Sequence, residues 1–168
     1  MTSAGGTVRE ARLDDVPALL HFIRELADYE REPDAVMTDE GQLAASLFGP
    51  APAVFAHVCE GSGPGGLAGM AIWFISYSTW TGRHGIWLED LYVRPNERRR
   101  GVARALFTTL ASLASEREYA RIDWSVLDWN HSAIRFYQSL GAVPMDEWTG
   151  YRLTGDALTS LGSGDNRT

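Results

Sequence analysis

The stretch that decides the fold runs from Ile86 to Ala105 and reads IWLEDLYVRPNERRRGVARA. Its apolar first half predicts a strand that ends at Val93; an arginine-rich loop follows, and a helix begins near Gly101. A helix that starts after such a strand and loop presents unpaired backbone N–H groups and the positive end of its dipole. The stretch therefore predicts a binding site for a phosphate or pyrophosphate.

The loop itself supplies groups suited to that anion, because it reads Arg98-Arg99-Arg100-Gly101-Val102-Ala103. Gly101 lets the backbone approach a ligand closely, and Ala103 keeps the next turn uncrowded. The arginines add charge-assisted donors. Just upstream, Glu89 and Asp90 lie on the strand, where an acid–base group would be useful.

Hydrophobic periodicity and turn signals predict an α/β arrangement around this stretch. Strands are expected at residues 7–13, 54–60, 67–77, 86–93 and 121–127, and helices at residues 16–29, 39–48, 101–118 and 131–140. Asp14 or Asp15 is the expected cap of the first helix and Thr38 that of the second. The strands up to residue 93 should form antiparallel hairpins, and the strand after the helical crossover should pair parallel with the central one.

The end of the chain completes this prediction. Residues 142–147 and 150–154 are expected to form a closing hairpin, and residues 162–168 a mobile tail. We therefore expect a single domain over residues 1–168 with its core at about residues 7–154. Its fold class is α/β, with a mixed, mostly antiparallel central sheet flanked by helices.

The amino-acid composition limits the partners and functions that are possible for the chain. The chain has 168 residues, is 45% hydrophobic and carries a formal net charge of −7, which disfavours nucleic acid as a partner and suits a cationic one. The single cysteine, Cys59, excludes an internal disulfide and fits a small core residue. No stretch reads as a signal peptide or membrane span, so we expect a cytoplasmic protein with no membrane partner.

Four patterns in the chain stand in a definite order and carry a resemblance. They are Leu88–Val93 (LEDLYV), Arg98-x-x-Gly101-x-Ala103, Val126–Asn130 (VLDWN) and Phe136-Tyr137-x-x-x-Gly141-Ala142. Together they resemble the GNAT N-acetyltransferases over roughly residues 7–154. Within that family the chain is most similar to the diamine acetyltransferases of the spermidine/spermine and thialysine types, through Glu25–Glu30 (ELADYE) and Tyr77–Arg83 (YSTWTGR).

The resemblance implies acetyl-CoA as co-substrate. It implies that the strand near Leu91–Val93 hydrogen-bonds the pantetheine arm like an added strand, and a bulge there could free N–H groups for an oxyanion site. The implied cofactor-binding residues are Leu91, Tyr92, Val93, Arg98, Arg99, Arg100, Gly101, Val102, Ala103, Arg104, Asn130, Ala133 and Tyr137. Asn130 can equally be a plain helix cap. The four histidines are scattered, so no metal is expected.

Amine acetylation requires a base, because a primary alkyl ammonium has a pKa of about 10.4. Glu89 is the candidate base, acting through water, and the resemblance implies that it is the carboxylate on the amine side. Adjacent residues on a strand point to opposite faces, so Asp90 is the weaker candidate. The alternative is that Glu89 is a surface carboxylate paired with an arginine.

Tyr137 is the candidate acid for the leaving thiolate, since a phenol is neutral at pH 7 and can donate a proton. The alternative is a core aromatic, because Tyr137 stands three residues from both Ile134 and Leu140. The family match at this position favours the catalytic role.

Tyr29, Glu30, Ser78 and Trp80, with Glu89 and Asp90, match positions that line the amine site in the diamine enzymes. Aromatic rings offer cation–π faces and Glu30 offers a countercharge. Where the spermidine/spermine enzymes carry Asp-Pro, this chain has Ser78-Thr79. The serine removes a countercharge and predicts a short diamine or lysine-like acceptor over spermine.

Two other functions remain open at this point: acetylation of a protein amine or aminated antibiotic, and acyl-CoA sensing without turnover. The resemblance also implies a homodimer in which the C-terminal segment contributes to the partner.

Overall fold

A computed structural model describes residues 6–164 of the chain. The chain divides into two compact units, Met1–Ser125 and Val126–Thr168, which are described in turn.

A five-stranded sheet forms the centre of the first unit. Its strands lie in the order β1 (Val8–Glu10), β2 (Phe55–Glu60), β3 (Leu67–Ser78), β4 (Arg83–Val93) and β5 (Ile122–Trp124). The first four pair antiparallel, and β5 pairs parallel with β4. The mixed, mostly antiparallel sheet expected from the sequence is confirmed, although β1 and β5 are shorter than predicted.

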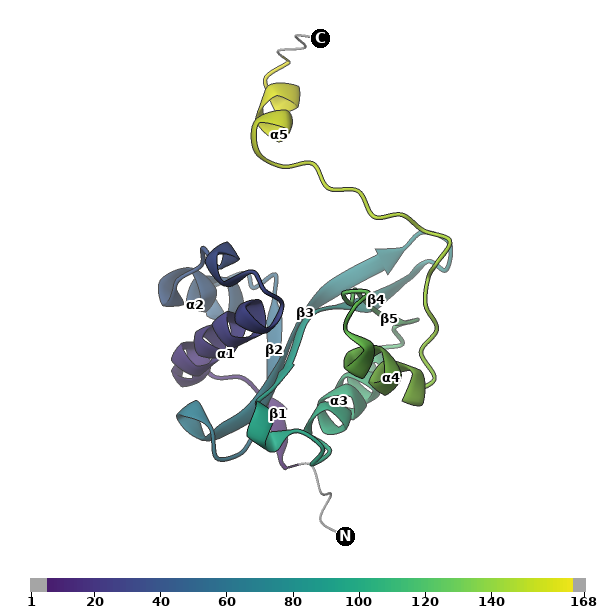
Figure 1. Cartoon of the computed structure of the whole chain (residues 1–168). Helices are drawn as coiled ribbons and strands as arrows, with labels where there is room; N and C mark the ends of the chain where they lie inside the picture. Colours follow the sequence, from purple (N-terminus) through teal and green to yellow (C-terminus); the bar gives the residue numbers. More distant parts are fainter. Residues whose placement is uncertain (1–5, 165–168) are drawn as a thin grey trace. The chain divides into compact units, whose positions relative to one another are not determined.

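Helices cover both faces of this sheet. They are α1 (Val16–Tyr29), α2 (Glu40–Phe48) and α3 (Val102–Glu116), with single 3-10 turns at Leu13–Asp15, Pro33–Ala35, Pro64–Gly66 and Pro95–Glu97. Figure 1 shows α1 and α2 on one side of the sheet and α3 on the other. Since α3 joins β4 to β5, the parallel pair arises from the predicted helical crossover.

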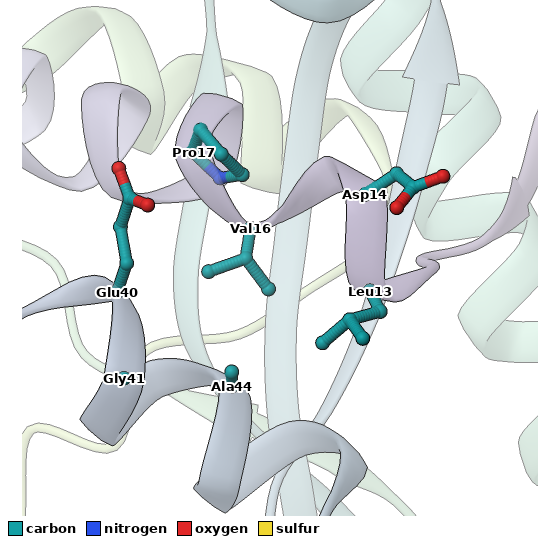
Figure 2. A pocket seen from close by; sticks show the side chains of 7 residues that line it. All are labelled: Leu13, Asp14, Val16, Pro17, Glu40, Gly41 and Ala44. Carbon is teal, nitrogen blue, oxygen red and sulfur yellow. The ribbon is translucent and has the colours of Figure 1, made fainter.

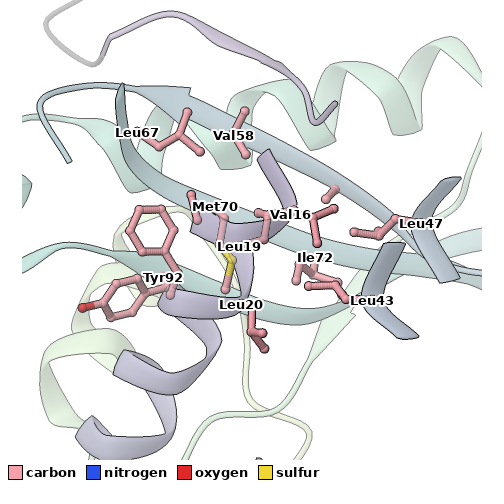
Figure 3. Close-up of a cluster of buried hydrophobic side chains, with 13 residues drawn as sticks. Val16, Leu19, Leu20, Leu43, Leu47, Val58, Leu67, Met70, Ile72 and Tyr92 are labelled. Carbon is pink, nitrogen blue, oxygen red and sulfur yellow. The ribbon is translucent and has the colours of Figure 1, made fainter. Parts of the chain in front are cut away.

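The main core lies between α1 and the sheet. Leu19 and Phe22 of α1 are fully buried, and they belong to one apolar cluster with Met70, Ile72 and Tyr92 (Figure 3). Burying each large apolar side chain contributes about 1.5–3 kcal/mol. This packing fixes the second half of β4 beneath α1, where the candidate site begins.

Helix starts differ in detail from the prediction. Asp39, not Thr38, caps α2, because its carboxylate accepts the Gln42 N–H at 2.8 Å. Asp15 does precede α1, but its carboxylate takes two hydrogen bonds from Arg9, at 2.7 and 3.0 Å. Asp15 therefore joins β1 to the start of α1 through an ion pair and does not cap the helix.

The second unit contains α4 (His131–Ser139) and α5 (Gly155–Gly162). Asn130 caps α4 as predicted, its side-chain oxygen accepting the Ala133 N–H at 3.2 Å. Gly141 follows the helix with a φ of 87°, a left-handed conformation that suits glycine at a helix end.

The closing hairpin predicted at residues 142–154 is wrong, because the structure has no strand there and forms α5 directly afterwards. Pro144 lies within the first expected strand and has no N–H for a ladder, which explains part of the error. Of the expected mobile tail, residues 165–168 lie outside the described residues, while residues 162–164 end α5 and form a turn.

Candidate active site

The centre of the candidate site is an irregularity in β4. Trp73 of β3 pairs with Leu88, but the next pair joins Ile72 to Asp90, so Glu89 is an extra residue on β4. Such a β-bulge interrupts the strict alternation of side chains between the faces of a sheet. Directly paired residues share a face; Asp90 therefore lies on the face of Ile72, which packs against α1.

Glu89 lies on the same side of the sheet as Asp90. Trp87 pairs with Phe74, which shares the α1 face with Ile72, and the Trp87 indole N–H donates to a Glu89 carboxylate oxygen at 3.0 Å. The expectation that Glu89 and Asp90 point to opposite faces is therefore wrong, because the bulge cancels the alternation. The bulge lies at Glu89, two residues before the Leu91–Val93 segment where a bulge could free N–H groups for an oxyanion site.

The two carboxylates differ in their surroundings. Glu89 is exposed, whereas burial raises the pKa of Asp90 to about 6, with further contributions from the negative charges of Glu89 and Glu30. Burial also raises the pKa of Glu30, which follows the last residue of α1. Glu30 faces the negative end of the helix dipole there. A cationic ligand would relieve the repulsion among these three groups.

Two predicted acceptor residues lie at the far end of the β3–β4 hairpin. Trp80 is 88% exposed, whereas Ser78 is buried and its hydroxyl accepts the Thr81 N–H at 3.3 Å. Ser78 is five residues beyond Trp73, about 16 Å along an extended strand. The structure thus groups Glu30, Glu89 and Asp90 electrostatically, and it does not bring Ser78 to them.

The predicted phosphate loop has glycine at the start of α3 as expected, and some of its arginine side chains contact other parts of the protein. Gly101 occupies the N-cap of α3 with a φ of 83° and has no side chain to cap the first-turn N–H groups. The Arg98 Nε donates to the Val93 carbonyl at 3.1 Å, and Arg100 pairs with Glu97 at 2.8 Å. Two of the three arginines, Arg98 and Arg100, therefore already contact the protein.

The remaining predicted site residues belong to the second unit. Ala133 and Tyr137 are four residues apart on α4 and share one helix face. Tyr137 is half-buried, and its ring lies 5.5 Å from that of Phe136 between centroids. Both the catalytic and the core reading of Tyr137 are compatible with that position.

Two hollows in the surface lie away from the carboxylate pair. The larger, of about 430 Å³, lies at the starts of α1 and α2 (Figure 2) and is lined by Leu13, Asp14, Val16, Pro17, Glu40, Gly41 and Ala44. A smaller one of about 170 Å³ includes Arg100 and Val102 of the loop. Across residues 6–164, no cluster of three or more His, Cys, Asp or Glu side chains could hold a metal ion. No helix among the same residues is long and apolar enough to cross a membrane.

Comparison with known proteins identifies the family to which the chain belongs. Residues 17–142 match the Acetyltransferase (GNAT) family, and the chain belongs to that family. The chain is an N-acetyltransferase that transfers an acetyl group to an amine.

Its relatives include two named enzymes. The chain is 37% identical over 163 residues to the thialysine N-epsilon-acetyltransferase of Bos taurus, covering 92% of this chain and 95% of that one. It is 27% identical to the L-ornithine N5-acetyltransferase of Arabidopsis thaliana, covering 92% and 86% respectively. An integron cassette protein from the V. cholerae mobile metagenome shares the fold, with a TM-score of 0.76 and 24% identity over 93% of this chain and 96% of that one.

Three features of the site were not predicted from the sequence. They are the position of the bulge, the Trp87 hydrogen bond to Glu89, and the contact of Arg98 with Tyr29. No glycine marks the bulge, so the sequence contains no local signal for it. The Trp87–Glu89 spacing of two residues could have suggested a same-face pair on a strand.

Proposed function

We propose that this chain is a cytoplasmic enzyme that moves the acetyl group of acetyl-CoA directly to the primary amine of a short diamine or a lysine-like amino acid. The observation that carries the proposal is the bulge at Glu89. It puts two carboxylates on one face of the strand that leads to the uncapped start of α3. A cation site and an anion site on one strand–loop–helix suit an ammonium acceptor and a CoA donor.

In this proposal the CoA pyrophosphate binds the backbone N–H groups at the start of α3. Gly101 allows the close approach, and the family resemblance assigns the loop arginines from Arg98 to Arg104 to the phosphates. Leu91 and Val93 offer backbone groups to the pantetheine arm, and Asn130 and Ala133 are assigned to the same cofactor. No metal is assigned a role.

The nitrogen of the acceptor loses two protons in the reaction. The attacking ammonium loses the first to the carboxylate pair on β4, where the family resemblance favours Glu89 acting through water. The nitrogen then attacks the thioester carbonyl, the C–S bond breaks, and Tyr137 donates a proton to the departing thiolate. The second nitrogen proton passes to the Tyr137 phenolate, which restores the hydroxyl as the neutral amide forms and free CoA leaves.

The acceptor side favours a short amine. Ser78 carries no charge, so the hairpin lacks the countercharge that an aspartate would offer to a second or third ammonium of a polyamine. Arg83 pairs directly opposite Ser78, six residues before Glu89 and about 20 Å along the strand, so it lies too far away to receive the carboxylate of a short amino-acid acceptor. The relatives named for thialysine and L-ornithine support this choice, because both compounds are amino acids with a terminal amine.

An amine panel tests this proposal. Purified enzyme and acetyl-CoA are incubated with thialysine, lysine, ornithine, putrescine, spermidine, spermine, an aminoglycoside and a peptide with a free N-terminus, and free CoA and acetylated product are measured. Product with a short amine is expected. Product only with the peptide or the aminoglycoside would support those rivals, and acetyl-CoA binding without any product would support a sensor.

A single substitution probes the assignment of Ser78. Ser78→Asp adds a carboxylate that can still accept the Thr81 N–H, so the hairpin turn is kept. We expect the ratio of kcat/KM for spermine to that for thialysine to rise. Ser78→Asn is the matched neutral control and should leave the ratio unchanged; equal ratios in both variants would remove Ser78 from the acceptor site.

We further propose that the enzyme is a homodimer through its C-terminal segment. Several large apolar side chains are exposed there, among them Val143 at 77% and Tyr151 at 96%. Large exposed apolar side chains can mark an interaction site. Light scattering should give twice the chain mass, and a Tyr151→Ser and Val143→Ser double variant should shift the mass toward the monomer. A monomeric wild type at micromolar concentration would contradict the proposal.

A further inference from the structure

We propose that Asp90, brought to the α1 face of the sheet by the bulge at Glu89, is the group on which the proton of the attacking amine comes to rest. This inference rests on the proposed function and deepens it. Glu89 then has a different role, as the exposed carboxylate that first meets the ammonium and keeps its neighbour basic.

Backbone geometry distinguishes the two carboxylates. Asp90 stands in register with Ile72, on the same face as Tyr92 two residues further on, and both of those residues belong to the α1 core cluster. Glu89 is the unpaired bulge residue, and the Trp87 indole N–H holds its carboxylate at 3.0 Å. Asp90 is therefore half-buried, while Glu89 is exposed and fixed in orientation.

The charges that face Asp90 are negative. Glu30 faces it from the end of α1 and Glu89 from β4, while its partner on β3 is the apolar Ile72. Further along the α1 face, the Tyr92 hydroxyl donates to the Glu25 carboxylate, and Arg98 lies over Tyr29. Burial, and then the negative charges of Glu89 and Glu30, raise the pKa of Asp90 to about 6, within the range that suits a general base near neutral pH.

The proposed step moves one proton from the ammonium nitrogen to the Asp90 carboxylate. The N–H bond of the ammonium breaks, an O–H bond forms on the Asp90 carboxylate, and the nitrogen keeps the electron pair with which it attacks the thioester. The proton reaches Asp90 through Glu89 or a water molecule and passes to solvent after the products leave. A neutral Asp90 also ends the repulsion among Glu30, Glu89 and Asp90, which favours the transfer.

Profiles of kcat/KM against pH separate Asp90 from Glu89. In the wild type the rate should fall below a pKa of about 6. Asp90→Asn should lower kcat by about a hundredfold or more and abolish this acid limb, and Asp90→Glu should restore it in part. Glu89→Gln should keep the limb and move it to lower pH, because Glu89 no longer raises the pKa of Asp90.

Asp14→Asn is the matched control, since it removes an exposed carboxylate remote from this strand, and it should leave kcat and the limb unchanged. An acid limb that survives in Asp90→Asn, or one that disappears in Glu89→Gln, would overturn the inference and return the base role to Glu89.

A second measurement does not depend on activity. Carbon-13 carboxyl NMR of the wild type and of Glu89→Gln follows Asp90 directly through its titration. The inference requires a wild-type midpoint near pH 6 that moves down in the variant, and a midpoint near the ordinary aspartate value of about 3.9 would refute it. If no amine in the panel is acetylated, the proposed function fails, while this titration still reports on Asp90.

Discussion

The guanidinium of Arg98 lies over the ring of Tyr29, with its central carbon 5.2 Å from the ring centroid. The same side chain donates to the carbonyl of Val93, the last residue of β4. Arg98 thus connects the loop before α3 with the end of α1, where Tyr29 is followed by Glu30. The cofactor loop and the acceptor side of the proposed site therefore share one cation.

Removing the ring should weaken cofactor binding. In Tyr29→Leu, Arg98 loses a cation–π contact worth about 0.5–1 kcal/mol at an exposed site, and the loop becomes less ordered. We expect acetyl-CoA to bind about two- to fivefold more weakly by calorimetry. Tyr29→Phe keeps the ring and should bind normally, so equal losses in the Leu and Phe variants would argue against the contact.

Gly101 offers a test of the anion site. Gly101→Ala and Gly101→Asp share the backbone strain of a left-handed residue, about 1–2 kcal/mol, and should lose similar thermal stability. Only the aspartate adds a negative charge at the first turn of α3. Acetyl-CoA affinity measured by calorimetry should fall at least about tenfold further in Gly101→Asp than in Gly101→Ala, and similar affinities would mean that the pyrophosphate binds elsewhere.

Tyr137→Phe removes one hydroxyl and tests the leaving-group acid. We expect kcat to fall about a hundredfold or more with little change in acetyl-CoA affinity, the pattern of a lost general acid. Tyr119→Phe makes the same chemical change at a ring that contacts His84 and serves as the control. A wild-type kcat in Tyr137→Phe would return this residue to a packing role.

The ionised side chain of Asp90 should lower the free energy of unfolding at neutral pH. Its folded pKa of about 6 lies above the unfolded value of 3.8, so stability from this group is greatest at low pH and is lost as the pH rises through 6. Asp90→Asn removes that loss. In urea unfolding, the free energy of unfolding of the variant minus that of the wild type should increase by about 1 kcal/mol between pH 5 and pH 8. A pH-independent difference would show that Asp90 is not perturbed.

Much of the sheet was predictable because its signals are local. Alternating apolar runs predicted β2, β3 and β4, and the crossover rule predicted the parallel pairing of β5. The start of α3 followed from a glycine after an apolar strand. These features depend on residues close together in the sequence.

The details of the candidate site depend on partners far apart in the sequence. The bulge at Glu89 is defined by its register with residues 72 and 73, and Arg98 meets Tyr29 across 69 positions, so neither leaves a local pattern. The prediction for the second unit was wrong for a related reason. The alternating pattern after Gly141 can form a strand only where a neighbouring strand is available for pairing. The predicted hairpin is therefore absent from residues 142–154.

The most direct test of the account is the ratio of kcat/KM for thialysine to that for spermine in the wild-type enzyme, measured by free-CoA release at pH 8. With a neutral Ser78 on the hairpin, we expect thialysine to be the better substrate. A preference for spermine of about tenfold or more, equivalent to about 1.4 kcal/mol in transition-state binding, would contradict it.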